Sequence, residues 1–460
     1  MSISNSVVQK LETIVGVDNI ILDEAIRHDY GHDASWHESH APDIVVFPEN
    51  VEQVQNIMQL ATESRTFVTP YGSGTGFEGN AIPISGGITL SLARLNKILS
   101  LDTHNMVLEA EAGVKLLDTE RVLRPHGLWI PTFPGTLEPT LGAIVSTNAS
   151  GKRSTLYGCT GDYVLTLDVV LADGTLIHVG RPVQKTVASY DLKRLFVGSE
   201  GTLGIIVKVA LRVIPIREGT AMAAHFKSLE QALAAVESLR QEDLQLSILE
   251  FSDARTTDLM LALGAPLRSG GDVLLLEIHQ LQRAPDIRIN LIEDICVSHG
   301  CVKFSVDFSR QEETALWRCR DDACALIYNH YPDRIDHNGE LVVPTTKFTQ
   351  LVMMAQALAA EQGIPILTFG HAGQGNLHTS VLGRRDMPSE IKASQEINDR
   401  LVTWAIDAGG TSTGEHGIGL SKLEHLLHEH PTIITYMQAI KDVFDPLGIL
   451  NPGKKLPSNT

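Results

Sequence analysis

The chain has 460 residues, 43% of them hydrophobic and 20% charged, which predicts a soluble globular protein with two domains and a smaller third element. Its net charge of −18, from 37 Lys and Arg against 55 Asp and Glu, argues against nucleic acid or anionic lipid as the main partner. No apolar run is long enough to predict a transmembrane segment, and the amino terminus lacks the pattern of a secretory signal. We therefore expect a cytoplasmic protein, with peripheral membrane contact left open.

The five cysteines form no recognisable redox motif, because no two of them are spaced as Cys-x-x-Cys. They are Cys159, Cys296, Cys301, Cys319 and Cys324. The sequence thus predicts no iron–sulfur cluster or haem in this chain.

The first predicted elements lead into a glycine-dense loop. A strand at residues 43–48 precedes a helix that starts after Asn50, and a second strand covers residues 66–69. The loop at residues 70–80 then offers successive backbone N–H groups, which suits a phosphate or pyrophosphate. Gly74 to Gly79 fits G-x-G-x-x-G, but the residues that follow cannot start a helix, so this is not a Rossmann loop.

A second glycine-rich region and two long strands complete this half of the chain. Residues 133–151 are polar and rich in glycine, and strands are predicted at residues 164–171 and 205–215. Residues 191–204, between these strands, end in Val-Gly-Ser-Glu-Gly-Thr-Leu-Gly. The first domain boundary is predicted at residues 215–219.

Helices and strands alternate in the middle of the chain. Strands are predicted at residues 246–251 and 272–278, and helices at residues 229–239, 287–300 and 312–328.

Arg320 lies on the last of these helices, on one stripe with Trp317 and Cys324. A planar guanidinium can make two parallel hydrogen bonds to a carboxylate, so Arg320 is a candidate substrate clamp. The alternative is an ordinary salt bridge with Asp321 or Glu313.

Two short glycine-rich segments bring together residues that commonly bind metal ions. His371 and His378 flank a predicted tight turn between two strands, where opposed side chains could share one ion. Glu415 and His416 are neighbours and point in different directions on a regular strand, so we assign them separate roles, Glu415 as the third ligand and His416 as a general base. Each could instead be an ordinary loop residue, but two such segments together favour a divalent metal site.

Five ordered motifs resemble those of a known family. They are the loop at residues 70–80, Asn148-Ala-Ser-Gly151, residues 197–204, the two metal-binding segments, and Asn451-Pro-Gly-Lys454. With them the chain resembles the FAD-linked oxidase family of the vanillyl-alcohol-oxidase type. Within it, the flavin-dependent D-lactate dehydrogenases, the FAD subunit of glycolate oxidase and D-2-hydroxyglutarate dehydrogenase are the most similar. The resemblance extends from Pro42 to Lys454.

The resemblance implies an α+β fold. Residues 1–216 would form an FAD-binding domain of two subdomains, of the p-cresol methylhydroxylase (PCMH) type. Residues 217–425 would form an antiparallel-sheet, ferredoxin-like substrate domain, and residues 426–460 a C-terminal helix and tail that fold back on the flavin.

The resemblance also implies which residues bind FAD. The binding is expected to be noncovalent, because the first glycine loop contains neither histidine nor cysteine, with Cys159 as the one reservation. The FAD-binding residues implied are Pro70, Gly72, Ser73, Gly74, Thr75, Gly76, Gly79, Asn80, Pro134, Gly135, Thr136, Thr140, Gly142, Asn148, Gly151, Glu200, Gly201, Ile206, Asn451 and Lys454.

The activity implied is oxidation of a small D-2-hydroxy acid, similar to D-lactate, to the 2-oxo acid by hydride transfer to flavin N5. His371, His378 and Glu415 would bind Zn²⁺, or alternatively Mn²⁺ or Fe²⁺, while His416 acts as the base and Arg320 as the carboxylate clamp. The electrons would pass to a quinone, a cytochrome, an electron-transfer flavoprotein or oxygen. The oligomeric state, with a homodimer as one option, stays open.

Several positions depart from the family pattern. Gln374 stands where many members have aspartate, which affects the surroundings of the metal ligands. Asn338 and Ser380 replace a lysine and an asparagine that serve a second substrate carboxylate in the hydroxyglutarate branch, although Arg334 could supply that cation.

Two alternatives to the D-lactate-like activity remain at this stage. One is a D-2-hydroxyglutarate dehydrogenase, and the other is an FAD-binding electron-transfer or assembly subunit of a larger oxidase complex. An ether-lipid synthase of the same fold needs no metal, so the pair His371 and His378 argues against it.

Overall fold

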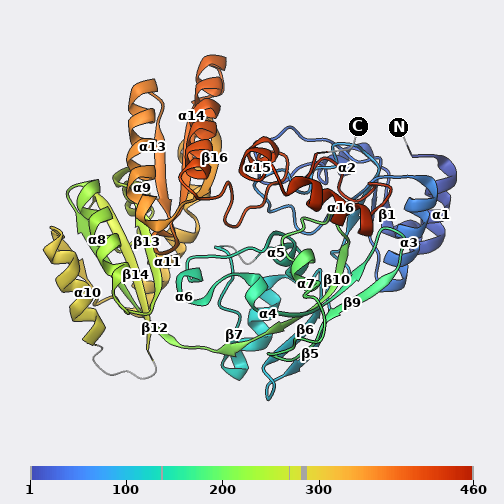
Figure 1. Cartoon of the computed structure of the whole chain (residues 1–460), viewed down its shortest axis with the longest axis horizontal. Coiled ribbons are helices and arrows are strands. Elements are labelled where there is room, and N and C mark those ends of the chain that lie inside the picture. The colour runs from blue at the N-terminus through green and yellow to red at the C-terminus, as the bar shows by residue number, and fades with distance from the viewer. Residues whose placement is uncertain (1–2, 136–137, 269, 281–286, 458–460) are drawn as a thin grey trace.

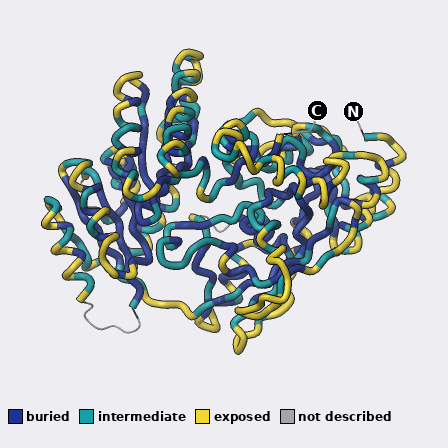
Figure 2. The backbone as a smooth tube through the Cα atoms, in the orientation of Figure 1, coloured by how far each residue is buried: buried dark blue, intermediate teal, exposed yellow. Residues whose placement is uncertain are grey.

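The computed structural model describes residues 3–135, 138–268, 270–280 and 287–457, and it has two parts that face each other (Figure 1). Residues up to Val213, together with the last helix and tail, form one part, and residues from about Glu218 form the other around a large sheet. Each part has its own buried core, and the facing surfaces between them are also largely buried (Figure 2). The α+β fold is thus confirmed.

A small, mainly parallel sheet begins the first part, in the order β1-β2-β4-β3. Helix α3 (Val51–Ser64) connects β2 to β3, and the side chain of Asn50 caps it by accepting a hydrogen bond from the N–H of Gln53, as the sequence predicts. The strands are β1 (Ile20–Ile21), β2 (Ile44–Val46), β3 (Val68–Tyr71) and β4 (Ile88–Ser91).

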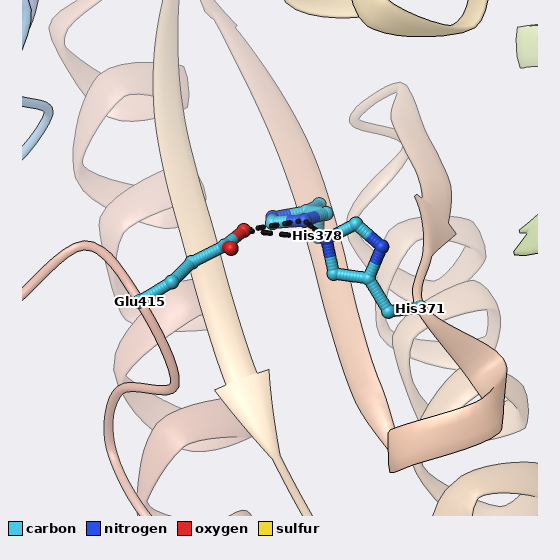
Figure 3. A group of neighbouring side chains, drawn as sticks. All are labelled: His371, His378 and Glu415. Atoms are coloured by element: carbon cyan, nitrogen blue, oxygen red, sulfur yellow. Dashed lines mark hydrogen bonds and ion pairs between the residues drawn. The ribbon is translucent and has the colours of Figure 1, made fainter. Parts of the chain in front are cut away.

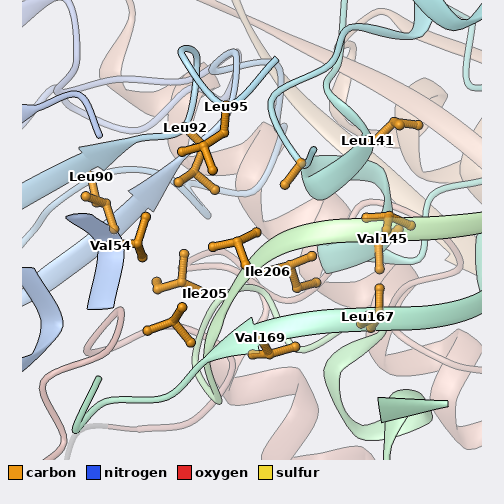
Figure 4. Packing of buried hydrophobic residues seen from close by; sticks show 14 of the residues in the cluster. Val54, Leu90, Leu92, Leu95, Leu141, Val145, Leu167, Val169, Ile205 and Ile206 are labelled. Atoms are coloured by element: carbon orange, nitrogen blue, oxygen red, sulfur yellow. The ribbon is translucent and has the colours of Figure 1, made fainter. Parts of the chain in front are cut away.

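A five-stranded antiparallel sheet, in the order β5-β6-β10-β8-β9, packs against the same core. Figure 4 shows Val54 of α3 and Leu90 of β4 in one cluster with Leu167 and Ile206 of the second sheet. The strands are β5 (Ile98–Asp102), β6 (Val107–Glu111), β8 (Val164–Val170), β9 (Leu176–Gly180) and β10 (Ile205–Arg212), with β7 (Leu128–Trp129) and β11 (Ile214–Pro215) as a separate pair. The other helices here are α1 (Asn5–Val15), α2 (Glu24–His28), α4 (Leu116–Leu123), α5 (Leu141–Thr147), α6 (Ser154–Tyr157) and α7 (Lys193–Phe196).

The second part is built on a seven-stranded, fully antiparallel sheet in the order β15-β12-β14-β13-β17-β18-β16. The strands are β12 (Glu218–Phe226), β13 (Leu246–Ser252), β14 (Asp272–Gln280), β15 (Lys303–Ser305), β16 (Arg334–Val342), β17 (Ile366–Gly370) and β18 (Asn376–Arg384). One face is apolar and lies beneath α8 (Leu229–Gln241), α10 (Ile287–Ser298), α13 (Phe348–Gln362) and α14 (Pro388–Asp407). The other face is partly covered by α9 (Ala254–Ala262) and carries buried polar side chains, among them Glu250 and His378. Alternation along the strands thus separates a structural face from a polar one.

The prediction of a single helix at residues 312–328 is wrong in one respect, because the structure has two helices in this segment. Helix α11 (Arg310–Asp321) starts with a capping box at Ser309, and α12 (Ala323–His330) follows after a break at Asp322. Aspartate favours helix ends over helix interiors, which accounts for the break.

The end of the chain returns to the first part, as Figure 1 shows. After α15 (Leu423–Glu429) and α16 (Ile434–Phe444), the N–H of Val68 on β3 donates to the carbonyl of Ile449, and the N–H of Asn451 donates to that of Val68. Asp445 is 1% exposed and accepts hydrogen bonds from the N–H groups of Ile449 and Leu450 and from the ammonium of Lys441. This carboxylate fixes the tail.

No helix within the described ranges is long and apolar enough to cross a membrane.

Replacing Asp445 with asparagine tests this tail contact. Lys441 is only 9% exposed and would lose its counter-ion, so we expect Asp445→Asn to lower the free energy of unfolding by about 3 to 5 kcal/mol. Asp442→Asn, an exposed change on the same helix, is the matched control and should stay within about 0.5 kcal/mol of wild type. Chemical denaturation measures both, and equal stability of the two variants would contradict the expectation.

Candidate active site

A cavity of about 230 Å³ lies where the two parts of the molecule meet. The first part contributes its glycine-rich segments. The second contributes the predicted metal ligands, which are His378 on β18, His371 in the turn before it and Glu415 in the loop after α14. The residues that line it include Thr75, Gly76, Phe77, Pro134, Gly135, Ser150, Gly151 and Lys152 from the first part, and Arg320, Cys324, Phe369, His371, His378, Glu415 and His416 from the rest.

Three of these side chains converge on one point (Figure 3). Nε2 of His371 lies 3.5 Å from Nε2 of His378, and Oε1 of Glu415 lies 3.4 Å and 3.3 Å from these two nitrogens. Three ligands at about 2.0 to 2.1 Å from a tetrahedral ion would be about 3.4 Å apart. The donor set therefore fits a divalent ion with one further coordination position on the cavity side.

The hairpin that carries the two histidines is present, but its predicted register is wrong. His378 on β18 pairs with Phe369, and His371 lies beyond the end of β17 in the turn that continues as a short 3₁₀ helix at Ala372–Gln374. The turn is wider than a tight hairpin turn, and Gly375 ends it with φ +75°. The imidazoles meet because the turn folds over the strand.

Two residues outside the triad orient its members. Oε1 of Glu250 lies 2.5 Å from Nδ1 of His371, which directs Nε2 of that ring toward the other ligands. Oγ of Ser150 donates to Oε2 of Glu415 at 2.9 Å, which leaves Oε1 for the ion. Ser150 belongs to the first part and Glu415 to the second, so this hydrogen bond joins the two parts at the site.

The triad is an environment that favours positive charge. Burial lowers the pKa of His371, but the carboxylates of Glu250 and Glu415 outweigh it and raise the pKa to about 10. Burial likewise raises the pKa of Glu415, yet His371 and His378 hold it well below its usual value. The positive charge that this environment favours can be a proton on His371 or a metal ion at the triad.

Arg320 pairs with Glu250 and not with Asp321 or Glu313, so the alternative predicted for it is wrong. Its Nε donates to Oε2 of Glu250 at 2.7 Å, and its guanidinium lies over the ring of Phe369. Arg320 is 7% exposed and lines the cavity, as a carboxylate clamp would. Asp321 instead binds Nζ of Lys152 at 2.5 Å.

His416 lies beside the triad rather than within it. Its Nε2 is 3.9 Å from Oε1 of Glu415, and its ring stacks on His378 at 5.5 Å between centroids. The imidazole lines the cavity and lies next to Phe77 of the glycine loop. This position suits a group that acts on a molecule in the cavity.

A second cavity runs along the glycine loop and is the natural place for a dinucleotide. Ser73 has a buried hydroxyl with no hydrogen-bond partner, and no N–H of residues 72–76 donates a hydrogen bond within the described part of the chain. Such unpaired donors fit an anionic ligand. A Cβ at Gly72 would lie 3.0 Å from Oγ1 of Thr140, so the backbone approach requires glycine there. The predicted FAD-binding residues that line this cavity are Pro70, Gly72, Ser73, Gly74, Thr75, Gly76, Asn80, Thr140, Gly142, Glu200, Gly201 and Ile206.

The other predicted FAD-binding residues lie elsewhere. Pro134, Gly135 and Gly151 line the cavity that contains the triad. Asn148 lines a neighbouring cavity that Glu415 also lines. Three others line none of these cavities: Gly79, packed against Leu420, and Asn451 and Lys454, whose side chains donate to the carbonyls of Asn80 and Ile82. Asn451 and Lys454 thus bind the backbone at the end of the glycine loop. Thr136 falls outside the described residues.

Sequence reasoning missed several residues of the site. Glu250 is the only charged residue in the buried strand β13, and Glu78 is the one charge in the glycine loop. Both are fully buried charged groups, which are rare unless paired. A lone charged residue in a buried strand or in a glycine loop indicates that its side chain is paired. The sequence does not identify the partner.

Residues 217–455 match the family "FAD linked oxidases, C-terminal domain", and residues 42–180 match "FAD binding domain". The chain is 32% identical to a probable mitochondrial D-lactate dehydrogenase of Danio rerio over 98% of this chain and 91% of that protein. It is 34% identical to glycolate oxidase subunit GlcD of Bacillus subtilis, over 98% and 97%. A D-2-hydroxyglutarate dehydrogenase of Stutzerimonas stutzeri is 28% identical, over 98% of each chain.

Solved structures of PCMH-type flavoproteins have the same fold. A 4-ethylphenol oxidase from Gulosibacter chungangensis superposes with a TM-score of 0.82 at 16% identity, over 98% of this chain and 97% of that one. For p-cresol methylhydroxylase the TM-score is 0.81 at 18% identity, over 98% and 96%. From its motifs, its fold and these matches, the chain belongs to the FAD-linked oxidase family and is a flavoprotein oxidoreductase.

Proposed function

We propose that the protein oxidises a small D-2-hydroxy acid, similar to D-lactate, to the 2-oxo acid, with noncovalent FAD and a divalent ion, preferably Zn²⁺. The observation that carries this proposal is the triad of His371, His378 and Glu415, whose ligand atoms are 3.3 to 3.5 Å apart in a cavity shared with Arg320 and His416. The names of the D-lactate dehydrogenases among its relatives support it.

Each side chain has a distinct role in this reaction. Arg320 binds the substrate carboxylate, and its pairing with Glu250 keeps the guanidinium in place. His416 removes the hydroxyl proton as general base. When bound, FAD accepts a hydride and the ion lowers the pKa of the hydroxyl. The apolar walls, which include the half-buried Phe77 and the buried Phe369, limit the access of water to the reacting atoms.

The residues next to Cys324, which lines the cavity, favour a monocarboxylate over D-2-hydroxyglutarate. Asn338 and Ser380 are paired on β16 and β18, and Nδ2 of Asn338 lies 4.0 Å from Sγ of Cys324, which lines the cavity. Ser380 donates to Asp336, and burial raises the pKa of this carboxyl to about 7. A second substrate carboxylate directed this way would face another acid.

Arg334 does not compensate for this acid. Its guanidinium donates to the carbonyl of Leu382 at 2.7 Å and lies 3.6 Å from a carboxylate oxygen of Glu390, so its charge is already paired. The dicarboxylate alternative is therefore the weaker one.

The proposal is tested by anaerobic mixing with a panel of D- and L-2-hydroxy acids while flavin absorbance is followed. Rapid bleaching by D-lactate or its short homologues, with slow or no bleaching by the L-isomers and D-2-hydroxyglutarate, is the expected result. If no acid bleaches the flavin, the electron-transfer or assembly subunit becomes the better account. The GlcD relative, which is named as a subunit, represents that alternative.

Denaturation of the purified protein should release intact FAD. The loop at residues 70–80 offers backbone donors and no histidine or cysteine for a covalent bond. Precipitation with acid, followed by chromatography of the supernatant, measures the released flavin. Flavin retained in the pellet would point to a covalent bond, for which Cys159 is the first residue to replace.

Removal of the metal ion should abolish oxidation of the 2-hydroxy acid while FAD stays bound. The triad lies at the substrate cavity, whereas the phosphate-binding loop uses separate residues. Treatment with a chelator, metal analysis and the flavin spectrum give the three readouts. Full turnover in protein shown to be metal-free would exclude the ion from the mechanism.

Replacing His416 with alanine should lower kcat by about 10² to 10⁴, with a smaller effect on KM. Metal and FAD contents should stay unchanged, because Nε2 of His416 is 3.9 Å from Oε1 of Glu415 and outside the ligand triangle. Steady-state kinetics and metal analysis measure this. Loss of the metal would mean that His416 is a ligand and that Glu415 has the other role.

A further inference from the structure

Glu78 has no part in the chemistry described above, although it is buried next to the base. It lies in the glycine loop, and its side chain is 3% exposed. Its Oε1 is 3.6 Å from Nδ1 of His416 and 3.0 Å from Nζ of Lys422. Its carbonyl oxygen accepts a hydrogen bond from the N–H of Leu420 at 2.7 Å. Both its side chain and its backbone therefore contact the segment that carries the base.

The two nitrogens of His416 have different surroundings. Nε2 lies 3.9 Å from Oε1 of Glu415, and both residues line the cavity. Nδ1 is buried and has no hydrogen-bond partner among the described residues, and the carboxylate of Glu78 lies just beyond hydrogen-bond range. Buried nitrogens without a partner are rare, and hydrogen bonds of catalytic groups are often long before the substrate binds.

Lys422 is shared between Glu78 and a second buried carboxylate, Glu340. Its Nζ lies 3.6 Å from Oε2 of Glu340, whose carboxylate accepts hydrogen bonds from the N–H of Gly414 at 2.7 and 2.8 Å. Glu340 thus holds the backbone immediately before the metal ligand Glu415. The two carboxylates have different targets, since only Glu78 lies against the imidazole of His416.

We propose that Glu78 is a positioning residue for the base. Its Oε1 accepts a hydrogen bond from Nδ1–H of His416, which leaves Nε2 unprotonated and directed into the substrate cavity. The tautomer matters because a neutral imidazole has one donor and one acceptor nitrogen, and only the acceptor can take the hydroxyl proton. This inference rests on the proposed function, in which His416 is the base.

The position of Glu78 also links the base to the cofactor loop. Glu78 follows two residues after the segment 72–76, whose unpaired N–H groups fit an anionic ligand. A ligand that orders this loop therefore also orders the carboxylate behind His416. The same residue has a simpler explanation, however, as the counter-ion of Lys422, and the experiments must separate the two.

A double-mutant cycle tests whether Glu78 acts through His416. In protein loaded with FAD and metal, Glu78→Gln should lower kcat about tenfold to a hundredfold and change KM by less than about threefold. In the His416→Ala background the same substitution should change kcat by less than about twofold. If it lowers kcat by the same factor in both backgrounds, the proposal is overturned.

A charge-balanced variant separates positioning from simple charge pairing. Glu78→Gln with Lys422→Met removes one buried carboxylate and one buried ammonium, so the net charge of the cluster with Glu340 is unchanged. Because Glu340 keeps its hydrogen bonds from the N–H of Gly414, part of the stability lost in Glu78→Gln should return. Under the proposal kcat stays low, because His416 still lacks its carboxylate. Recovery of kcat to within about twofold of wild type would show that Glu78 serves only Lys422. This variant also covers the case in which Glu78→Gln alone fails to fold.

Nitrogen-15 NMR of histidine-labelled protein gives a readout that does not depend on turnover. The ring resonances of His416, assigned by their loss in His416→Ala, should show Nδ1 protonated in wild type and a changed tautomer in Glu78→Leu, because leucine offers no acceptor to Nδ1–H. An unchanged tautomer in the variant would overturn the proposal. Failure of the proposed function is a separate result, since then no 2-hydroxy acid would bleach the flavin of the wild-type protein.

Discussion

The carboxylate of Glu250 joins the two functions that the candidate site must combine. One oxygen lies 2.5 Å from Nδ1 of His371, and the other accepts from Nε of Arg320 at 2.7 Å. Burial raises the pKa of Glu250, but Arg320 and His371 outweigh it and lower the pKa to about 2. This one buried anion therefore sets both the ring orientation of His371, the proposed metal ligand, and the position of Arg320, the proposed carboxylate clamp.

The site depends equally on the docking of the two parts of the molecule. Ser150 in the first part orients Glu415, and Glu200 in the first part accepts from the N–H groups of Ile418 and Gly419, three and four residues further along. Arg153 makes two hydrogen bonds to the buried carboxylate of Glu277 on the large sheet. Because these contacts are polar and buried, a shift between the parts would leave charges unpaired.

The sequence was informative where residue type and local spacing determine the outcome. Helix α3, the buried strands and the proximity of His371, His378 and Glu415 could be predicted because caps, apolar periodicity and clusters of histidine and glutamate in glycine-rich segments are local signals. The register of the histidine hairpin could not, because it depends on how residues 371–375 fold against the neighbouring Val343 and Thr155. Nor could the partners of Arg320 or His416, since Glu250 and Glu78 are 70 and more than 300 residues away and only the tertiary fold brings them near.

Under the proposed function, charge balance in the cavity favours a substrate with one carboxylate over a substrate with two. Arg320 is balanced by Glu250, and Lys152 by Asp321, so these two pairs add no net charge. A divalent ion held by neutral histidines and Glu415 then contributes a single net positive charge, which one substrate carboxylate neutralises. A second carboxylate would have no counter-charge and would approach the buried acid Asp336. In the proposed reaction, the charges that line the cavity therefore disfavour a second substrate carboxylate.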